Sequence, residues 1–163
     1  MLIHCDGFDH YATAQAVAGQ KWDEVVNATI SATFARSGGQ GCQLGNSGAT
    51  LGKVVPAQTT YIVGQAYKWS TANDSTNEIF TFMDGTTIQV SVHNFNGVIS
   101  AFRNGTVLLA TASTTIGVNQ YRYLEAKVFV DPTVGTVTVR MDGAVILSFT
   151  GNTRQSGTSQ ITK

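Results

Sequence analysis

Apolar and polar residues alternate along short runs in the second half of this chain. Within residues 86–93, and again within residues 121–130, an apolar residue recurs at every second position. An alternation with period two places one set of side chains on each face of a strand. Both segments are therefore predicted to be half-buried strands, with Leu124, Ala126 and Val128 facing the core.

Four dipeptides that favour tight turns separate these runs: Asp84-Gly85, Asn96-Gly97, Asn104-Gly105 and Asp142-Gly143. Gly, Asn and Asp tolerate the positive φ that a two-residue hairpin turn requires. Further runs of strand character cover residues 29–34, 42–44, 61–69, 78–83, 98–103, 107–112, 137–141 and 145–149. About ten short strands at this spacing predict an all-β antiparallel sandwich, barrel or jelly roll.

The first half is less regular. Residues 2–5 are expected to form a short strand, and residues 12–26 a short helix or a loop. Residues 61–69 are long enough for one central strand, and the polar residues 70–77 are expected to form a loop. Because no low-complexity linker divides the chain, residues 1–163 are predicted to be one domain.

Composition narrows the function classes. Charged residues make up 12% of the chain and the formal net charge is zero, without the basic stripe of a nucleic-acid binder. No run has the apolar length of a membrane span, and the N-terminus lacks the pattern of a signal peptide. We therefore expect no nucleic-acid or membrane partner, and synthesis in a cytoplasm. Cys5 and Cys42 are expected to be buried thiols, with a single bridge as the alternative.

One stretch carries a more specific pattern. Residues 121–131 read Tyr-Arg-Tyr-Leu-Glu-Ala-Lys-Val-Phe-Val-Asp, and residues 135–143 read Gly-Thr-Val-Thr-Val-Arg-Met-Asp-Gly. With the strand pair at residues 96–105, this resembles the concanavalin A-like superfamily, in particular its laminin-G-like jelly rolls. The opening Asp-Gly-Phe-Asp-His-Tyr of residues 6–11, with Trp22 downstream, resembles versions found in tailed-bacteriophage structural proteins.

The resemblance implies a single antiparallel β-sandwich jelly roll over residues 1–163. This sequence departs from the family at the closing C-terminal strand, which is either minimal, or lacking or shared with another molecule. Domains of this family usually close with a C-terminal strand beside the N-terminal one. Here either Ile161 and Thr162 supply a minimal closing strand, or the edge near residues 2–5 is left for another molecule. An unpaired edge is a template for pairing between molecules.

Catalytic and metal-binding patterns are weak. Glycosidases of the superfamily carry several carboxylates at alternate positions of one strand, whereas Glu125 is followed by Lys127, which predicts a solvent-exposed ion pair. His93 falls on the polar face of its strand, and no GxSxG elbow accompanies the three histidines. The Asp and Asn residues of the four turn dipeptides are better explained as turn formers than as calcium ligands. We expect no enzyme activity, no metal and no cofactor.

Glycan binding requires aromatic rings that stack on sugars. The available residues are Tyr61, Tyr67, Trp69, Tyr121, Tyr123 and Trp22. Trp69, beside the polar segment 70–77, is the candidate expected to be exposed, with Tyr67 and Asn73 as neighbours in a glycan site. The competing interpretation is that these aromatic side chains pack in the core.

The resemblance implies a non-enzymatic virion protein, a head-decoration or a tail or baseplate accessory subunit that binds other virion proteins. It would form a homo-oligomer or part of a capsid or tail lattice, and be made in the host cytoplasm. A host-surface glycan is a further expected ligand, and the alternative function is a carbohydrate-binding module that recognises surface glycans.

Overall fold

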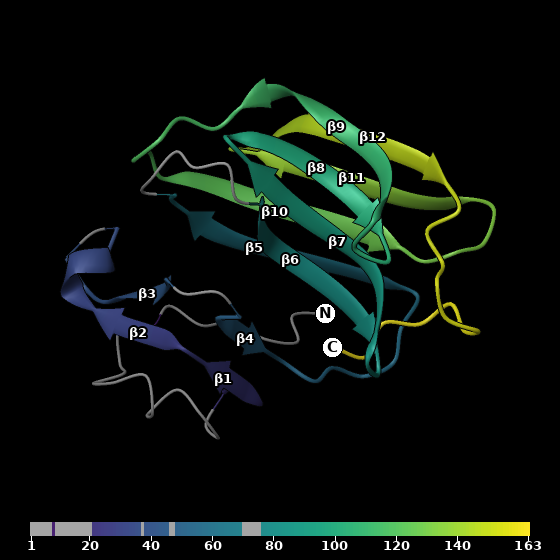
Figure 1. Cartoon of the computed structure of the whole chain (residues 1–163), viewed down its shortest axis with the longest axis horizontal. Coiled ribbons are helices and arrows are strands. Elements are labelled where there is room, and N and C mark those ends of the chain that lie inside the picture. The colour runs from purple at the N-terminus through teal and green to yellow at the C-terminus, as the bar shows by residue number, and fades with distance from the viewer. Residues whose placement is uncertain (1–7, 9–20, 37, 46–47, 70–75) are drawn as a thin grey trace. The chain divides into compact units, whose positions relative to one another are not determined.

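The computed structural model describes residues 8, 21–36, 38–45, 48–69 and 76–163, which form two compact units (Figure 1). Unit 1 comprises residues up to Val55 together with Lys163, and unit 2 comprises Pro56–Thr162. The strand expected at residues 2–5, the thiol of Cys5 and the side chain of Asn73 lie outside the described residues. No helix among the described residues has the length and apolar character that crossing a membrane requires.

Unit 1 contains two small antiparallel sheets. Strand β1 (Glu24–Val26) pairs with β4 (Thr50–Gly52), and β2 (Ala28–Ser31) pairs with β3 (Gly41–Leu44). Ile30 is buried, and it packs with Phe8, Trp22, Val25, Cys42 and Leu51 in a small core.

Two expectations for this unit are corrected. Of the helix or loop expected for residues 12–26, the last three residues form strand β1, whose Val25 and Val26 are β-branched and favour extended backbone. Residues 12–20 lie outside the described part. The strand expected over residues 29–34 stops at Ser31, because the Ser31 side chain accepts a hydrogen bond from the Thr33 amide and caps a 3₁₀ turn, Ala32–Phe34.

Unit 2 is an antiparallel β-sandwich of two four-stranded sheets (Figure 1). In sheet I the strand order is β12-β11-β10-β5, and in sheet II it is β6-β7-β8-β9. Their bounds are β5 (Thr60–Tyr67), β6 (Thr76–Asp84), β7 (Thr87–Phe95), β8 (Val98–Arg103), β9 (Val107–Thr115), β10 (Arg122–Phe129), β11 (Gly135–Met141) and β12 (Ala144–Gly151). The all-β sandwich expected from the alternation is confirmed.

The core of the sandwich lies where the inward faces of the two sheets meet. Leu124, Ala126 and Val128 of sheet I and Val90 and Val92 of sheet II are fully buried. The alternate residues of the same strands point away from this core, as the period-two pattern predicts. Burial of these side chains supplies the main driving force for joining the sheets.

The turn dipeptides adopt the predicted backbone. Both residues of Asn96-Gly97, Asn104-Gly105 and Asp142-Gly143 have positive φ, which is the geometry of a type I′ turn. At Asp84-Gly85 only the glycine has positive φ, and Asp84 belongs to the end of β6. Three of the dipeptides therefore form turns as expected, whereas the turn between β6 and β7 consists of Gly85 and Thr86.

One strand lies elsewhere in its sheet than expected. Strand β5 occupies an edge of sheet I, beside β10, rather than a central position. After β5 the next four strands, β6 to β9, all belong to sheet II, and the next strand of sheet I is β10. Strand β5 therefore pairs only with a strand that is distant in sequence.

A C-terminal strap, residues 155–162, lies against the beginning of strand β7, at Gln89. Gln89 is fully buried, and its side chain makes five hydrogen bonds to the strap, with Gln155, Ser156, Thr158 and Gln160. Near the end of the strap lies Ile161, whose side chain is buried in the core of the sandwich.

Ile161 makes a single antiparallel bridge with Gln58, just before β5, and the Thr162 amide donates to the carbonyl of Met83 at the end of β6. Because residues 2–5 lie outside the described part of the chain, both arrangements considered for the C-terminal residues stay predictions.

Candidate functional site

The outer face of sheet I carries an exposed aromatic ring beside a cluster of charged residues. We call it the Tyr123 face and define it by Ile62, Gly64, Tyr123, Glu125, Lys127 and Arg140. The strand register places Gly64, Glu125 and Arg140 in one row across β5, β10 and β11, with Ile62 and Lys127 in the next row. On β10 these residues alternate with the buried Leu124, Ala126 and Val128.

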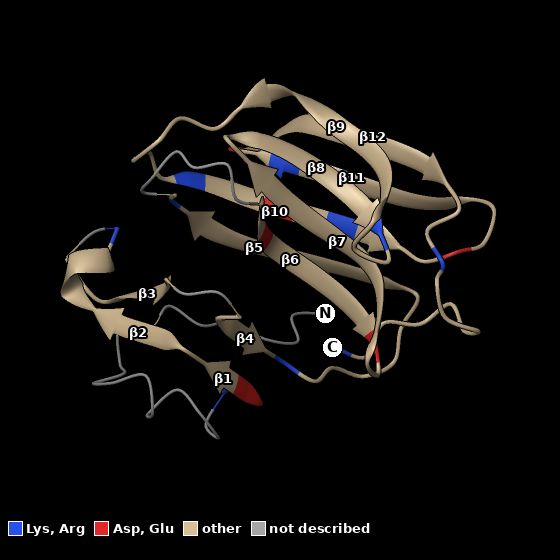
Figure 2. Ribbon diagram, viewed as in Figure 1, with Lys and Arg blue, Asp and Glu red and all other residues tan. Residues whose placement is uncertain are grey.

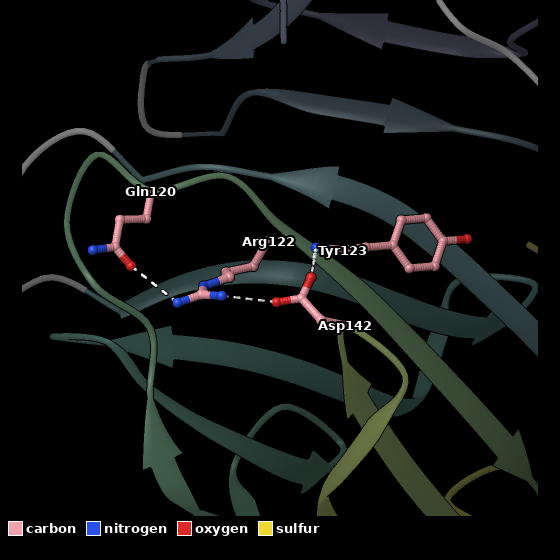
Figure 3. Close-up of polar contacts among 4 residues, drawn as sticks. All are labelled: Gln120, Arg122, Tyr123 and Asp142. Carbon is pink, nitrogen blue, oxygen red and sulfur yellow. Dashed lines mark hydrogen bonds and ion pairs between the residues drawn. The ribbon is translucent and has the colours of Figure 1, made fainter.

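The Asp142 turn holds the first residues of β10 in place (Figure 3). One carboxylate oxygen of Asp142 accepts the Tyr123 amide at 2.9 Å, and the other accepts Arg122 Nη1 at 3.0 Å. Gln120 accepts the second guanidinium nitrogen of Arg122 at 3.2 Å. The Tyr123 ring points away from these groups, so they fix its backbone without covering the ring.

The ring of Tyr123 lies over Gly64 of the neighbouring strand. A Cβ atom placed on Gly64 would lie 2.9 Å from Cζ of Tyr123, so any side chain there would displace the ring. The nearest atoms belong to the hydroxyl end of the side chain, and Tyr123 is 44% exposed, so part of the residue is open to solvent. A rigid aromatic face with a polar hydroxyl at its end is a surface suited to binding a partner or a sugar.

The charges of the Tyr123 face are arranged across strands rather than along one strand. Glu125 pairs with Arg140 at 3.0 Å, and not with Lys127 as expected. The reason is geometric: directly opposed residues of antiparallel strands have Cβ atoms about 5 Å apart, closer than neighbours two positions along a strand. Lys127 is exposed next to Ile62.

The glycan site expected around Trp69 is not assembled on the surface. Trp69 is 7% exposed and belongs to the sandwich core, which corrects the expectation that it is exposed. Tyr67 is half-buried; burial raises the pKa of its hydroxyl, and the hydrogen bond from Asn94 Nδ2 at 3.2 Å partly opposes this. With Asn73 outside the described residues, glycan binding by these three residues stays a prediction.

His93 is also more buried than its place on a polar face suggested. It is 6% exposed because its ring stacks on Phe102 of the adjacent strand, at 4.6 Å between centroids. Its Nε2 lies 3.5 Å from a Glu78 carboxylate oxygen and makes no hydrogen bond to a described residue. Burial lowers the pKa of the imidazole, and the Glu78 charge opposes that shift.

The described residues contain no group of three or more His, Cys, Asp or Glu side chains that could hold a metal ion. Lys and Arg are spaced along the described strands and turns of unit 2 and are not gathered into a stripe (Figure 2).

Comparison of the sequence and structure with protein-family models, with curated proteins and with solved structures found no match.

Sequence reasoning placed Tyr123 among the available aromatic residues but did not single it out. A signal was present: Gly64 interrupts a strand of otherwise larger residues, and a glycine within a strand often marks close approach by another group. The pairing of β5 with β10 was needed to connect Gly64 with Tyr123.

Proposed function

We propose that this protein is a non-enzymatic structural component of a tailed-phage virion, where it acts as a head-decoration or a tail or baseplate accessory subunit. It binds other virion proteins through the exposed outer face of sheet I, as a homo-oligomer or within a capsid or tail lattice. Its location is the virion, after synthesis in the host cytoplasm.

The observation that carries this proposal is the Tyr123 face. It combines an exposed aromatic ring, the exposed apolar side chain of Ile62 and charges that are already partly paired. Aromatic and arginine residues are the types most often found at the centre of protein interfaces. The motifs at residues 96–105 and 121–143 resemble laminin-G-like domains. The opening at residues 6–11, with Trp22 downstream, resembles versions of these domains in tailed-phage structural proteins, which supports the virion assignment.

Particle composition tests the proposal. Purified virions from a phage that encodes this protein should contain it in a fixed ratio to the major structural protein, as measured by quantitative mass spectrometry. Replacing Tyr123 with Ala should reduce incorporation, while Val134→Ala, a change of an exposed residue in the connection between β10 and β11, should leave it unchanged. Absence of the protein from purified particles would refute the virion assignment.

A carbohydrate-binding module is the second candidate, and the position of the Tyr123 ring favours it. The hydroxyl end of Tyr123 lies over Gly64 and 44% of the residue is exposed, so part of the side chain is accessible to a sugar. The hydroxyl, carboxylate and amine groups nearby could donate and accept hydrogen bonds with sugar hydroxyls.

Paired variants separate this candidate from the first. In affinity gels or glycan arrays, Tyr123→Ala should weaken binding at least about tenfold, whereas Tyr123→Phe, which keeps the ring face, should retain most of it. The buried Trp69 is a poor choice for this test because its replacement would disturb the core. Equal losses in the Ala and Phe variants would exclude stacking, and no binding by the wild type would exclude the module.

A further inference from the structure

Sheet II contains two Asn-Gly turns with the same dipeptide and different surroundings. Asn96-Gly97 joins β7 to β8, and Asn104-Gly105 lies between β8 and β9. Their φ values are similar, 48° and 85° in the first turn and 53° and 68° in the second. Both Asn side chains are exposed.

An Asn-Gly sequence can modify itself without an enzyme. The backbone nitrogen of the glycine attacks the amide carbon of the asparagine side group, forming a new bond between them and closing a five-membered succinimide. The bond from that carbon to the original amide nitrogen breaks, and this nitrogen leaves as ammonia with the proton lost from the glycine amide. Water then opens the succinimide at either carbonyl, which yields aspartate or isoaspartate. The reaction therefore needs a glycine amide that is free to lose its proton and approach the asparagine.

The amide of Gly97 is held in place. It donates a hydrogen bond to Asn94 Oδ1 at 2.8 Å, and Asn94 is fully buried. Asn94 is itself fixed by its contact with the Tyr67 hydroxyl. Gly97 is also closely packed, since a Cβ atom placed there would lie 3.3 Å from a ring carbon of Trp69. Attack on Asn96 would have to break this hydrogen bond and move a buried turn.

The amide of Gly105 has no such restraint. The turn is closed by a hydrogen bond from Thr106 to the Arg103 carbonyl, and the Asn104 amide donates to the Gln89 carbonyl. These bonds use the amides on either side of Gly105, whose own amide finds no acceptor among the described residues. The space around Gly105 is open, with only Ile88 Cδ1 within 4 Å of a Cβ placed there, at 3.8 Å.

We propose that Asn104 is a site of spontaneous deamidation and isomerisation, with the Gly105 amide as the nucleophile and water as the co-reactant, while Asn96 is protected by Asn94. The modification converts a neutral amide into a carboxylate. In the isoaspartate product it also adds a methylene to the backbone inside the turn, next to the hydrogen bond between Asn104 and Gln89.

Peptide mapping by mass spectrometry tests the proposal on the purified full-length protein, incubated folded at mildly alkaline pH. Product should accumulate at Asn104 at least about fivefold faster than at Asn96, which is the factor that one intramolecular hydrogen bond typically contributes. In the denatured protein the two rates should converge, because both sites share the same dipeptide. Similar rates in the folded protein, or an equal difference in the denatured protein, would overturn the proposal.

A pair of variants tests the cause of the protection. Asn94→Ala removes the acceptor of the Gly97 amide and should raise the rate at Asn96 toward that at Asn104. Tyr67→Phe removes the other hydrogen bond of Asn94 and keeps the acceptor, so the rate at Asn96 should stay low. If Asn94→Ala fails to fold, the comparison of folded and denatured wild type still decides the outcome.

Discussion

Replacing Gln89 with Ala should release the C-terminal strap and destabilise the sandwich. The side chain is fully buried and makes five hydrogen bonds to residues of the strap. Its amide nitrogen has two hydrogens for three acceptors, so the five contacts are equivalent to about four bonds of about 1 kcal/mol each. Water can replace some of the lost partners because Gln155 and Thr158 are exposed, which reduces the expected loss to about 2–3 kcal/mol.

The assay is denaturant unfolding, with Gln65→Ala as the matched control. Gln65 is an exposed glutamine on a strand of the same unit, so its replacement should change stability by no more than about 0.5 kcal/mol. In Gln89→Ala, hydrogen exchange should also accelerate at the Ile161 amide, which bonds to the Gln58 carbonyl at 2.7 Å. If the two variants lose the same stability, the strap is not held by Gln89 and the reasoning is wrong.

Three further measurements test the packing and electrostatics of unit 2. Burial lowers the pKa of His93, so the unfolded protein takes up a proton at this residue before the folded protein does as the pH falls below about 6.5. The free energy of unfolding should therefore decline in this pH range. His93→Gln should reduce the decline, as measured in unfolding curves recorded at several pH values. Asp142→Ala removes both the acceptor of the Tyr123 amide and a residue that tolerates positive φ, so it should lower the free energy of unfolding by about 1–2 kcal/mol and lower the thermal midpoint. Asp142→Asn should cost less. Leu124→Ala should cost about 2–5 kcal/mol in denaturant unfolding, against less than about 0.5 kcal/mol for the exposed Val145→Ala; similar values would contradict the assignment of the core.

The local part of this fold was predictable from the sequence. The strand β8, for example, was placed at its observed bounds because two Asn-Gly dipeptides delimit it and each imposes positive φ at its own position. The inward residues of β10 were predictable because alternation is a property of adjacent positions.

The errors in unit 2 concern partners that are distant in sequence. The edge position of β5 depends on its pairing with β10, and the Glu125–Arg140 contact depends on the register of β10 with β11. The burial of Trp69 depends on packing in the sandwich, because the polar character of residues 70–77 carries no information about what lies against the ring. The Tyr123 face was missed for the same reason. Gly64 of β5 and Tyr123 of β10 are neighbours in the sheet, but all four strands of sheet II lie between them in the sequence.

That separation has a consequence for how the molecule acquires its structure. During synthesis β5 leaves the ribosome before β10 exists, while each hairpin of sheet II can form as soon as its second strand appears. Closing a long loop costs more entropy than closing a two-residue turn, and such pairings form slowly. We therefore expect an early species in which β6 to β9 are paired and β5 still lacks its neighbour, so nascent polypeptides are most exposed to mutual association before β10 arrives.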